Sequence, residues 1–215
     1  MRLNIIQKEI DACKIFADVG CDHGKISKYV LDNGLCDKAY ISDVSATCLK
    51  KAEILLSDYI AKGKCISFVS NGLREVPPAD FVLIAGMGGK EIIEILSCDL
   101  DKIESSTLLL QPMKNSMEVR EFLLLHGFTI LLDYTFRDKL FYDIIKAKKL
   151  PKMDFYTEDE KEFGRDNLTR KDKDFMAKIK REFDRNEKVL KTCKLQDKSK
   201  TELCLRQEKL KGILL

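Results

Sequence analysis

The chain has 215 residues, of which 45% are hydrophobic, and its formal net charge is +3 at pH 7. This length suits one domain of ordinary size with an appendage, and no run approaches the roughly 18 apolar residues that a membrane-spanning helix needs. The amino-terminal segment mixes Lys8, Glu9 and Asp11 among its hydrophobic residues. We therefore expect neither a signal peptide nor a membrane segment, and a soluble, cytoplasmic protein.

The cysteines and histidines are placed without the spacing of a metal site. Only His23 and His126 are present as histidines, and no two cysteines form a C-x-x-C pair. The cysteines are Cys13, Cys21, Cys36, Cys48, Cys65, Cys98, Cys193 and Cys204. We interpret them as reduced thiols and expect no bound metal.

The charges are distributed unequally about Pro151. Residues 1–150 contain 20 Lys and Arg against 21 Asp and Glu, whereas residues 151–215 contain 18 against 14. A basic tail attracts a partner that carries phosphates. A solvated surface of mixed charge gives the same count, and composition alone favours that simpler interpretation.

Short β-rich runs alternate with longer segments whose apolar residues recur at helical spacing. The predicted strands are 15–19, 39–42, 65–70, 81–85, 107–111 and 128–134, and the predicted helices are 25–31, 46–61, 90–96 and 116–126. A polar turn at 137–139 leads directly into another β-rich run at 140–147, so the last strand must be antiparallel. The pattern predicts a Rossmann-like α/β fold, a mainly parallel sheet with an antiparallel terminal strand, which is the topology of class I methyltransferases.

The segment after Pro151 is densely charged and carries two thin apolar stripes. Phe175, Ile179, Phe183 and Leu190 fit one helix face, and Leu203, Leu210 and Leu214 fit a second. Two helices joined near 195–199 would form an antiparallel hairpin. We therefore predict two domains, at 1–150 and at 151–215.

The first strand is followed by an acidic glycine loop. Residues 18–24 read Asp-Val-Gly-Cys-Asp-His-Gly, and Asp22 stands where a dinucleotide-binding loop has its second glycine. A carboxylate repels a pyrophosphate but attracts the sulfonium cation of S-adenosylmethionine (SAM). The loop therefore favours SAM over NAD or ATP, and methyl transfer over hydride transfer.

Polar residues follow the second and third strands at the same sheet edge. Asp43 lies 25 residues after Asp18, where a carboxylate accepts hydrogen bonds from the two hydroxyls of an adenosine ribose. The alternative role for Asp43 is capping the next helix, and the two roles are compatible. Asn71-Gly72 follows the third strand, where an amide would read the adenine edge, although Asn-Gly is also a common turn.

The fourth strand ends in a glycine-rich turn, Ala85-Gly86-Met87-Gly88-Gly89. Its exposed amides allow a cofactor or a base to approach closely, and the helix that begins there favours an anion such as the methionine carboxylate. Methyltransferases that act on an exocyclic amine usually carry an Asn/Asp-Pro-Pro-aromatic motif here. This chain lacks that motif, which argues against an amino-group target and leaves room for a ring nitrogen.

Several motifs together resemble the bacterial tRNA (adenine-N1)-methyltransferases of the TrmK family, which act on adenine 22 in the D-arm region. The motifs are residues 17–23 in the glycine loop, 80–89 around the glycine-rich turn, Leu109-Leu110-Gln111-Pro112, Arg120-Glu121-Phe122-Leu123 with Gly127-Phe128, and Tyr142-Asp143-Ile144. The resemblance implies a class I methyltransferase domain, a coiled-coil-like helical domain, SAM as cofactor and tRNA as partner. It leaves the oligomeric state open, with a monomer as the simplest expectation.

The resemblance also implies roles for individual residues. Asp22 matches the catalytic position. Expected cofactor contacts are Asp18, Gly20, Asp22, His23, Asp43, Val44, Asn71, Gly72, Ala85, Gly86, Met87 and Gly88. The chain has Asp43 where the family often has Glu, Asn71 where it often has Asp, and Met113 where it often has Asn. The first two changes keep an oxygen acceptor, whereas the third changes a position near the substrate.

These observations lead to a hypothesis for the reaction. Adenine N1 attacks the sulfonium methyl, while Asp22 accepts a hydrogen bond from the N6 amine and stabilises the cation that forms. Gln111, Pro112 or Tyr142 would contact the base, with Phe141 as an alternative stacking partner, although an aromatic residue in a terminal strand is more often part of the core. Lysines and arginines of the tail would hold phosphates. Two alternatives remain, a class I methyltransferase with another RNA position, a protein or a small molecule as substrate, and a non-catalytic RNA-binding module.

Overall fold

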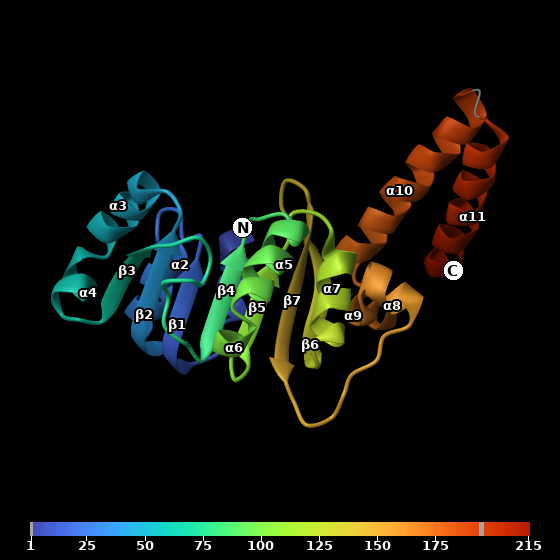
Figure 1. The fold of residues 1–215 in the computed structure, drawn as a ribbon. Helices are drawn as coiled ribbons and strands as arrows, with labels where there is room; N and C mark the ends of the chain where they lie inside the picture. Colours follow the sequence, from blue (N-terminus) through green and yellow to red (C-terminus); the bar gives the residue numbers. More distant parts are fainter. Residues whose placement is uncertain (1, 194–195) are drawn as a thin grey trace.

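The structure, a computed structural model, describes residues 2–193 and 196–215. At its centre lies one seven-stranded sheet in the order β3-β2-β1-β4-β5-β7-β6 (Figure 1). The strands are β1 (Cys13–Val19), β2 (Cys36–Asp43), β3 (Cys65–Val69), β4 (Phe81–Ala85), β5 (Thr107–Gln111), β6 (Phe128–Arg137) and β7 (Phe141–Lys149). Every predicted strand is present, with ends shifted by a few residues.

The directions of the strands confirm the predicted topology. All pairs among β1 to β5 are parallel. β7 lies between β5 and β6 and runs antiparallel to both of them. The hairpin closes where the Asp138 N–H donates to the Leu140 carbonyl at 2.9 Å. The sheet is therefore Rossmann-like and mainly parallel, with an antiparallel last strand.

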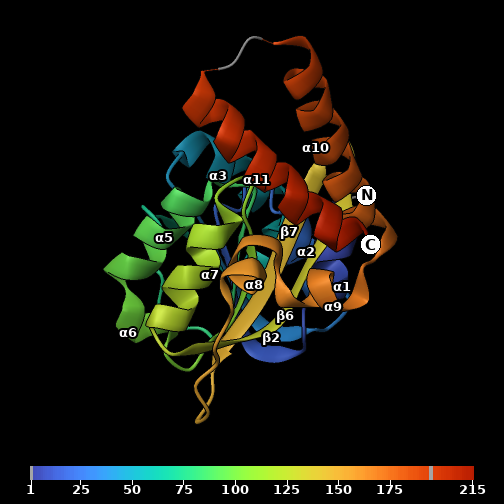
Figure 2. The ribbon, with the colours of Figure 1, turned by 90° about the vertical axis from the view of Figure 1, so that its right-hand side faces the viewer.

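Helices cover both faces of the sheet. One face carries α1 (Arg2–Lys8), α2 (Lys25–Asp32), α3 (Ala46–Leu55) and α4 (Ser57–Ala61), and the other carries α5 (Gly89–Cys98), α6 (Leu100–Ile103) and α7 (Ser116–Leu125). Figure 2 shows α5 and α7 on the side of the sheet opposite α1 and α2. Each face has its own core, with Ile92 and Val119 buried on one side and Val30 and Leu49 on the other. Burial of these apolar faces holds the three layers together.

The helix predicted at 46–61 is divided in two. Leu56, between α3 and α4, has φ −105° and ψ 13°, outside the helical region. Its side chain is fully buried, and a Cβ on Gly24 at the start of α2 would lie 3.1 Å from the Leu56 Cδ1. The prediction of one helix was wrong because apolar spacing does not show that the backbone leaves the helical conformation at Leu56.

The segment after β7 contains two short helices that the apolar pattern did not predict, α8 (Glu158–Phe163) and α9 (Arg165–Arg170). Thr157 and Glu160 form a capping box at the start of α8. The long helices α10 (Lys173–Thr192) and α11 (Asp197–Leu214) then pack side by side in opposite directions (Figures 1 and 2). Leu195, at the start of the expected turn between them, lies outside the described residues.

The helical hairpin is held by a small apolar core of its own. Phe175 and Ile179 of α10 and Leu210 of α11 are buried together with Phe163 of α8. Leu214 packs against this cluster at its edge. The expected seam between the two helices is therefore present, and α8 closes one end of it. The domain boundary predicted at Pro151 falls between β7 and α8 and stays a prediction, because polar contacts cross it.

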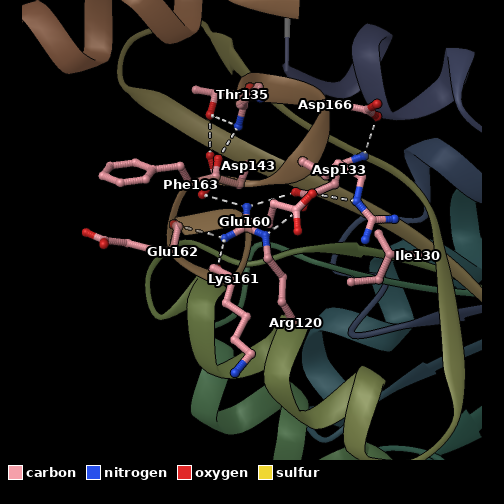
Figure 3. Close-up of polar contacts among 12 residues, drawn as sticks. Arg120, Ile130, Asp133, Thr135, Asp143, Glu160, Lys161, Glu162, Phe163 and Asp166 are labelled. Atoms are coloured by element: carbon pink, nitrogen blue, oxygen red, sulfur yellow. Dashed lines mark hydrogen bonds and ion pairs between the residues drawn. The ribbon is translucent and has the colours of Figure 1, made fainter. Parts of the chain in front are cut away.

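Those contacts centre on Arg120 of α7, whose side chain is fully buried. Its guanidinium binds both carboxylate oxygens of Asp133 on β6, each at 2.8 Å. The same guanidinium donates to the carbonyls of Lys161 and Glu162 in α8, at 3.1 and 3.3 Å (Figure 3). One buried cation thus links the sheet, α7 and α8.

A second buried carboxylate extends the network to α10. Asp143 of β7 accepts from the Thr135 hydroxyl at 2.6 Å and from the Lys178 ammonium at 2.9 Å. Burial favours the neutral acid, but Lys178 and Arg120 together hold the pKa of Asp143 below its ordinary value. Asn167 of α9 also donates to Thr135, at 3.0 Å. The position of the helical segment is therefore set by ionic contacts to β6 and β7.

Replacing Asp133 by asparagine removes the bidentate partner of a buried cation. We expect Asp133→Asn to lower the free energy of unfolding by about 3–5 kcal/mol, because Arg120 stays charged and loses its main partner. Asp184→Asn is the matched control, since Asp184 pairs with Lys180 at an exposed site, and it should cost less than about 1 kcal/mol. Urea unfolding measures both, and equal losses in the two variants would contradict the role of the network.

Candidate functional site

The carboxyl ends of β1, β2 and β4 meet at one edge of the sheet. Val19 of β1 is paired with Ser42 of β2 and with Ile84 of β4, so the turns that follow these strands lie together. A cavity of about 300 Å³ opens between the turns. It is lined by Arg2, Val19, Gly20, Asp22, Asp43, Val44, Ser70, Asn71, Gly72, Ala85, Gly86, Met87, Glu91 and Ile95. Most of the residues predicted from the sequence are therefore gathered in one place.

The glycine loop after β1 is fastened to the end of β2. The N–H groups of Gly20 and Cys21 donate to the Ser42 carbonyl at 2.8 and 2.9 Å. Gly20 has φ +71°, and a Cβ there would lie 2.1 Å from the Met87 Cε. The loop thus favours a glycine for its backbone conformation, and the Met87 side chain packs where a Cβ would lie.

Asp22 stands at the tip of this loop with a left-handed backbone, at φ +50°. Its side chain is 69% exposed, and its Oδ1 lies 2.8 Å from the Nδ1 of His23. Its N–H donates to Asp43 at 3.3 Å. A short polar side chain tolerates this conformation better than a bulky one does. The carboxylate is consequently held by His23 while it still faces solvent.

Asp43 has two structural contacts at the end of β2. One oxygen accepts from the Asp22 N–H, and the other accepts from the Ser45 N–H at 2.8 Å. The N-cap of α3 is Ser45, whose hydroxyl accepts from the Cys48 N–H at 3.3 Å. The alternative role considered for Asp43, capping the next helix, was therefore wrong, because Ser45 is the N-cap. Asp43 instead steadies the turn before α3 and borders the cavity.

A smaller cavity of about 80 Å³ adjoins the first, and Arg2, Gly20, Asp22 and Ala85 line both of them. Its wall also includes Asp18, Cys21, His23, Lys25, Ile26, Leu3 and Ile6. Asp18 is 5% exposed and accepts from the Ser27 hydroxyl at 2.6 Å. Burial raises the pKa of Asp18 to about 6, although the hydrogen bond from Ser27 opposes the shift. An acid so placed is an acceptor for a cationic group.

The glycine-rich turn after β4 is bound to the turn after β5. Gly86 N–H donates to the Gln111 carbonyl at 3.1 Å, and Gly89 N–H donates to the Lys114 carbonyl at 2.9 Å. The Met87 carbonyl accepts from Met113 N–H at 2.8 Å. Gly88 is the N-cap of α5 and does not line the cavity. The two turns therefore form one packed unit.

The three residues predicted to contact the substrate are placed differently from one another. Gln111 is fully buried, and its Nε2 donates to the Pro112 carbonyl at 3.0 Å. Tyr142 packs against Phe136, with ring centroids 5.6 Å apart. Pro112 lines a further hollow, which lies between the sheet and α10 and is separate from the two cavities described above. Gln111 thus shapes the turn, Pro112 is buried beside it, and Tyr142 is half-buried.

Arg2 is a site residue that the sequence analysis missed. It borders both cavities, its guanidinium lies 5.8 Å from the ring centroid of Tyr142, and a Cβ on Gly86 would lie 3.7 Å from its two terminal nitrogens. Its backbone N–H donates to Asp138 at 3.1 Å. The sequence offered no signal for this position, because α1 reaches the site only through the fold.

Two further properties concern the part of the chain that the structure describes. Residues 2–193 and 196–215 contain no group of three or more His, Cys, Asp or Glu side chains that could hold a metal ion. None of the helices in the same residues has the length and apolarity needed to cross a bilayer. All eight cysteines are free thiols.

Comparison with known families and sequences agrees with the geometry of the site. Residues 1–145 match the family model described as a methyltransferase domain. A relative from Mycoplasma genitalium, provisionally named a tRNA methyltransferase, is 31% identical over 147 residues, 65% of this chain and 64% of its own length. The tRNA (adenine(22)-N(1))-methyltransferase of Bacillus subtilis is 29% identical over 129 residues, 57% of this chain and 52% of its own length. The chain thus spans less than two thirds of the length of these relatives.

A solved structure extends the similarity beyond the sheet. TrmK of M. capricolum, determined in complex with S-adenosylhomocysteine (SAH), superimposes with a TM-score of 0.88 at 25% identity. The match covers 100% of this chain and 96% of the other. The likeness therefore includes the helical segment as well as the α/β part.

The packing of the two turns predicts the effect of adding a methyl group at Gly89. A Cβ there would lie 2.4 Å from the Asn115 carbonyl oxygen and 2.7 Å from that of Lys114. Although alanine favours helices, we expect Gly89→Ala to lower the free energy of unfolding by about 1–3 kcal/mol. Gly212→Ala in α11 is the control: no atom lies within 4 Å, and it should stabilise by about 0.5–1 kcal/mol. Urea unfolding distinguishes them, and stabilisation by both would refute the close packing.

Proposed function

The chain belongs to the TrmK family of class I methyltransferases, and we propose that it transfers a methyl group from SAM to N1 of adenine 22 in tRNA. The observation that carries the proposal is the pair of connected cavities around the acidic loop, with Asp22 in the wall of both. The enzyme would act on tRNA in the cytoplasm, as a monomer. It belongs among the enzymes of tRNA modification.

The residues of the two cavities fit SAM and do not fit a dinucleotide. The larger cavity presents Asp43 for the ribose and Asn71 for the adenine, and it is acidic where a pyrophosphate would need a cation. In the smaller cavity Asp18 would bind the methionine ammonium, and Arg2 would bind the methionine carboxylate. The proposed cofactor contacts are Arg2, Asp18, Gly20, Asp22, His23, Asp43, Val44, Asn71, Gly72, Ala85, Gly86, Met87 and Gly88.

Asp22 is the proposed catalytic residue. SAM supplies a methyl group that the positive sulfur makes electrophilic. Adenine N1 has a lone pair of its own, so the protein need not supply a strong base. The Asp22 carboxylate accepts a hydrogen bond from the adenine N6 amine and stabilises the positive charge that the ring acquires. His23, 2.8 Å away, holds that carboxylate in place.

The target atom constrains how the base must be presented. N1 lies on the Watson–Crick edge, so the adenine must leave its stack and any base pair, at a cost of a few kcal/mol. Pro112 and Tyr142 are the proposed contacts for the extruded base. Gln111 supports Pro112 through its hydrogen bond to the Pro112 carbonyl.

Reverse transcription of treated tRNA tests the proposed function. Unmodified tRNA is incubated with the enzyme and SAM, and primer extension is then compared with and without enzyme. Because N1-methylation blocks base pairing, we expect a new stop at adenine 22. A stop elsewhere would indicate another RNA position, and methyl incorporation without a stop would indicate another atom. Absence of SAH binding in calorimetry would favour a non-catalytic module.

Asp22→Asn separates catalysis from cofactor binding. Asparagine also tolerates the left-handed backbone, so the loop should keep its shape. We expect the turnover number to fall by about 10²-fold or more, because the charge that stabilises the product cation is lost. The dissociation constant of SAH should change little. Unchanged turnover would exclude Asp22 from the chemistry.

The raised pKa of Asp18 predicts a pH dependence of cofactor affinity. An ammonium binds the ionised carboxylate, so SAH should bind about tenfold more weakly at pH 5 than at pH 7. Because its folded pKa of about 6 exceeds the ordinary 3.8, Asp18 stabilises the folded state at low pH, and this contribution is lost as pH rises through 6. Calorimetry across this range measures the affinity. Asp18→Asn should flatten the profile, and an unchanged profile in that variant would assign the pH dependence to another group.

A further inference from the structure

A groove runs between the sheet and α10, next to the proposed site. Two hollows of about 410 and 460 Å³ form it, and both are lined by Phe141 and Lys178. The first extends along 112–118, the turn after β5 and the start of α7, and the second reaches Arg181 and Arg185 on α10. Met113 in the first hollow is hydrogen-bonded to Met87, which borders the cofactor cavity. The groove therefore ends beside the proposed position of the methyl group.

The charges of the groove are unequally satisfied. Three of its four acids have cationic partners: Glu182 binds Arg206 at 2.8 Å, Asp143 binds Lys178 at 2.9 Å, and Glu162 binds Lys209 at 2.6 Å. The fourth, Glu118, accepts from the neutral Asn115 amide at 2.6 Å.

The cations Lys114, Arg181 and Arg185 form no ion pair with any residue in 2–193 or 196–215. Three of the four acids are neutralised within the protein and these three cations are not, so the groove presents an excess of positive charge to a partner. Phosphate groups at regular spacing match such a row of cations.

An aromatic ring stands in the middle of the groove. Phe141 borders both hollows, and the Arg137 guanidinium lies 5.5 Å from its ring centroid. Leu140 beside it is 52% exposed. Unpaired bases stack on such rings, whereas the bases of an intact RNA helix are already stacked on one another. Cations around a partly exposed ring are therefore the pattern that binds single-stranded nucleic acid.

The width of the groove is set by polar contacts that join its two walls. Lys178 of α10 is bound to Asp143 of β7, which also lies 3.6 Å from Arg120. Asp174 at the start of α10 accepts from the Arg137 N–H at 2.9 Å. Both walls are thus held to the same two strands, and a bound strand meets a preformed surface.

We propose that this groove holds the unpaired tRNA strand that flanks the target adenine, with Arg181, Arg185 and Lys114 on its phosphates and a base stacked on Phe141. The proposal rests on the proposed function and adds to it the path by which the tRNA strand reaches the site. The strand enters along α10, passes Phe141 and delivers the adenine past Pro112 to the cofactor. The methyltransferase and helical segments would then bind one strand jointly.

The salt dependence of tRNA binding tests the phosphate contacts. Binding of unmodified tRNA is measured with SAH present, for the wild type and for the double variant Arg181→Gln, Arg185→Gln. Each lost contact to a single strand lowers the slope of log K against log salt by about 0.7, so the double variant should lose about 1.4. The control Lys62→Gln, Lys64→Gln removes the same charge at the opposite edge of the sheet, just before β3, and should keep the slope.

Phe141 variants test the stacking. We expect Phe141→Ala to weaken tRNA binding about tenfold, and Phe141→Tyr to restore it, because both aromatic rings stack on a base. The dissociation constant of SAH should be unchanged in every groove variant, which shows that the cofactor site is intact.

The outcomes separate the two proposals. If wild-type enzyme binds and methylates tRNA while the arginine variant keeps the full salt slope and Phe141→Ala keeps its affinity, the groove is not the path and the proposed function stands. If the wild type binds SAH but neither binds nor methylates tRNA, the proposed function fails, and the groove assignment fails with it.

Discussion

The parallel pairing of β1 with both β2 and β4 is the constraint on which the site depends. Parallel strands end at the same edge, so pairing Val19 with Ser42 and Ile84 brings three turns together that are far apart in the sequence. The loop after β1 is then fastened to Ser42, and the turn after β4 is fastened to the turn after β5. None of these hydrogen bonds involves a side chain that would contact a ligand. Backbone hydrogen bonds thus build most of the cavities, and the Asp43 side chain adds its own contacts to the N–H groups of Asp22 and Ser45.

That charge explains the choice of ligand. A dinucleotide loop keeps a glycine where this chain has Asp22, and the exposed carboxylate makes the cavity unsuitable for a pyrophosphate. The buried Asp18 and the neighbouring Arg2 add one acid and one base to the smaller cavity. An amino acid carries the complementary pair of charges, so the smaller cavity suits the methionine end of SAM and the larger one suits the adenosine. The smaller and larger cavities thus correspond to the two chemical parts of SAM, its methionine and its adenosine.

Local patterns predicted the parts of this protein that depend on local sequence. The strands, the glycine loop and Asp43 could be located because each rests on a few adjacent residues. Arg120 and Arg2 could not be located in this way, because an arginine in an amphipathic segment is normally solvated. Only the assembled fold shows that Arg120 is fully buried and that Arg2 borders the site. The break at Leu56 and the burial of Gln111 escaped for the same reason, since both depend on what packs against them. The capping box at Thr157 was readable and would have located α8.

The charge of the C-terminal segment acquires a more specific meaning in the structure. Counted along the sequence, its excess of cations fits a solvated surface as well as a phosphate-binding one. In the fold, Arg165, Lys178, Arg206 and Lys209 are all paired with carboxylates, and these pairs hold α8, α10 and α11 in place. Much of the charge is therefore structural, as the simpler interpretation expected. Arg181 and Arg185 differ because they line the groove without such partners among the described residues. The number of cations thus matters less than where the fold places those without an ion pair, and Arg181 and Arg185 lie on the face of α10 that lines the groove with Leu140 and Phe141.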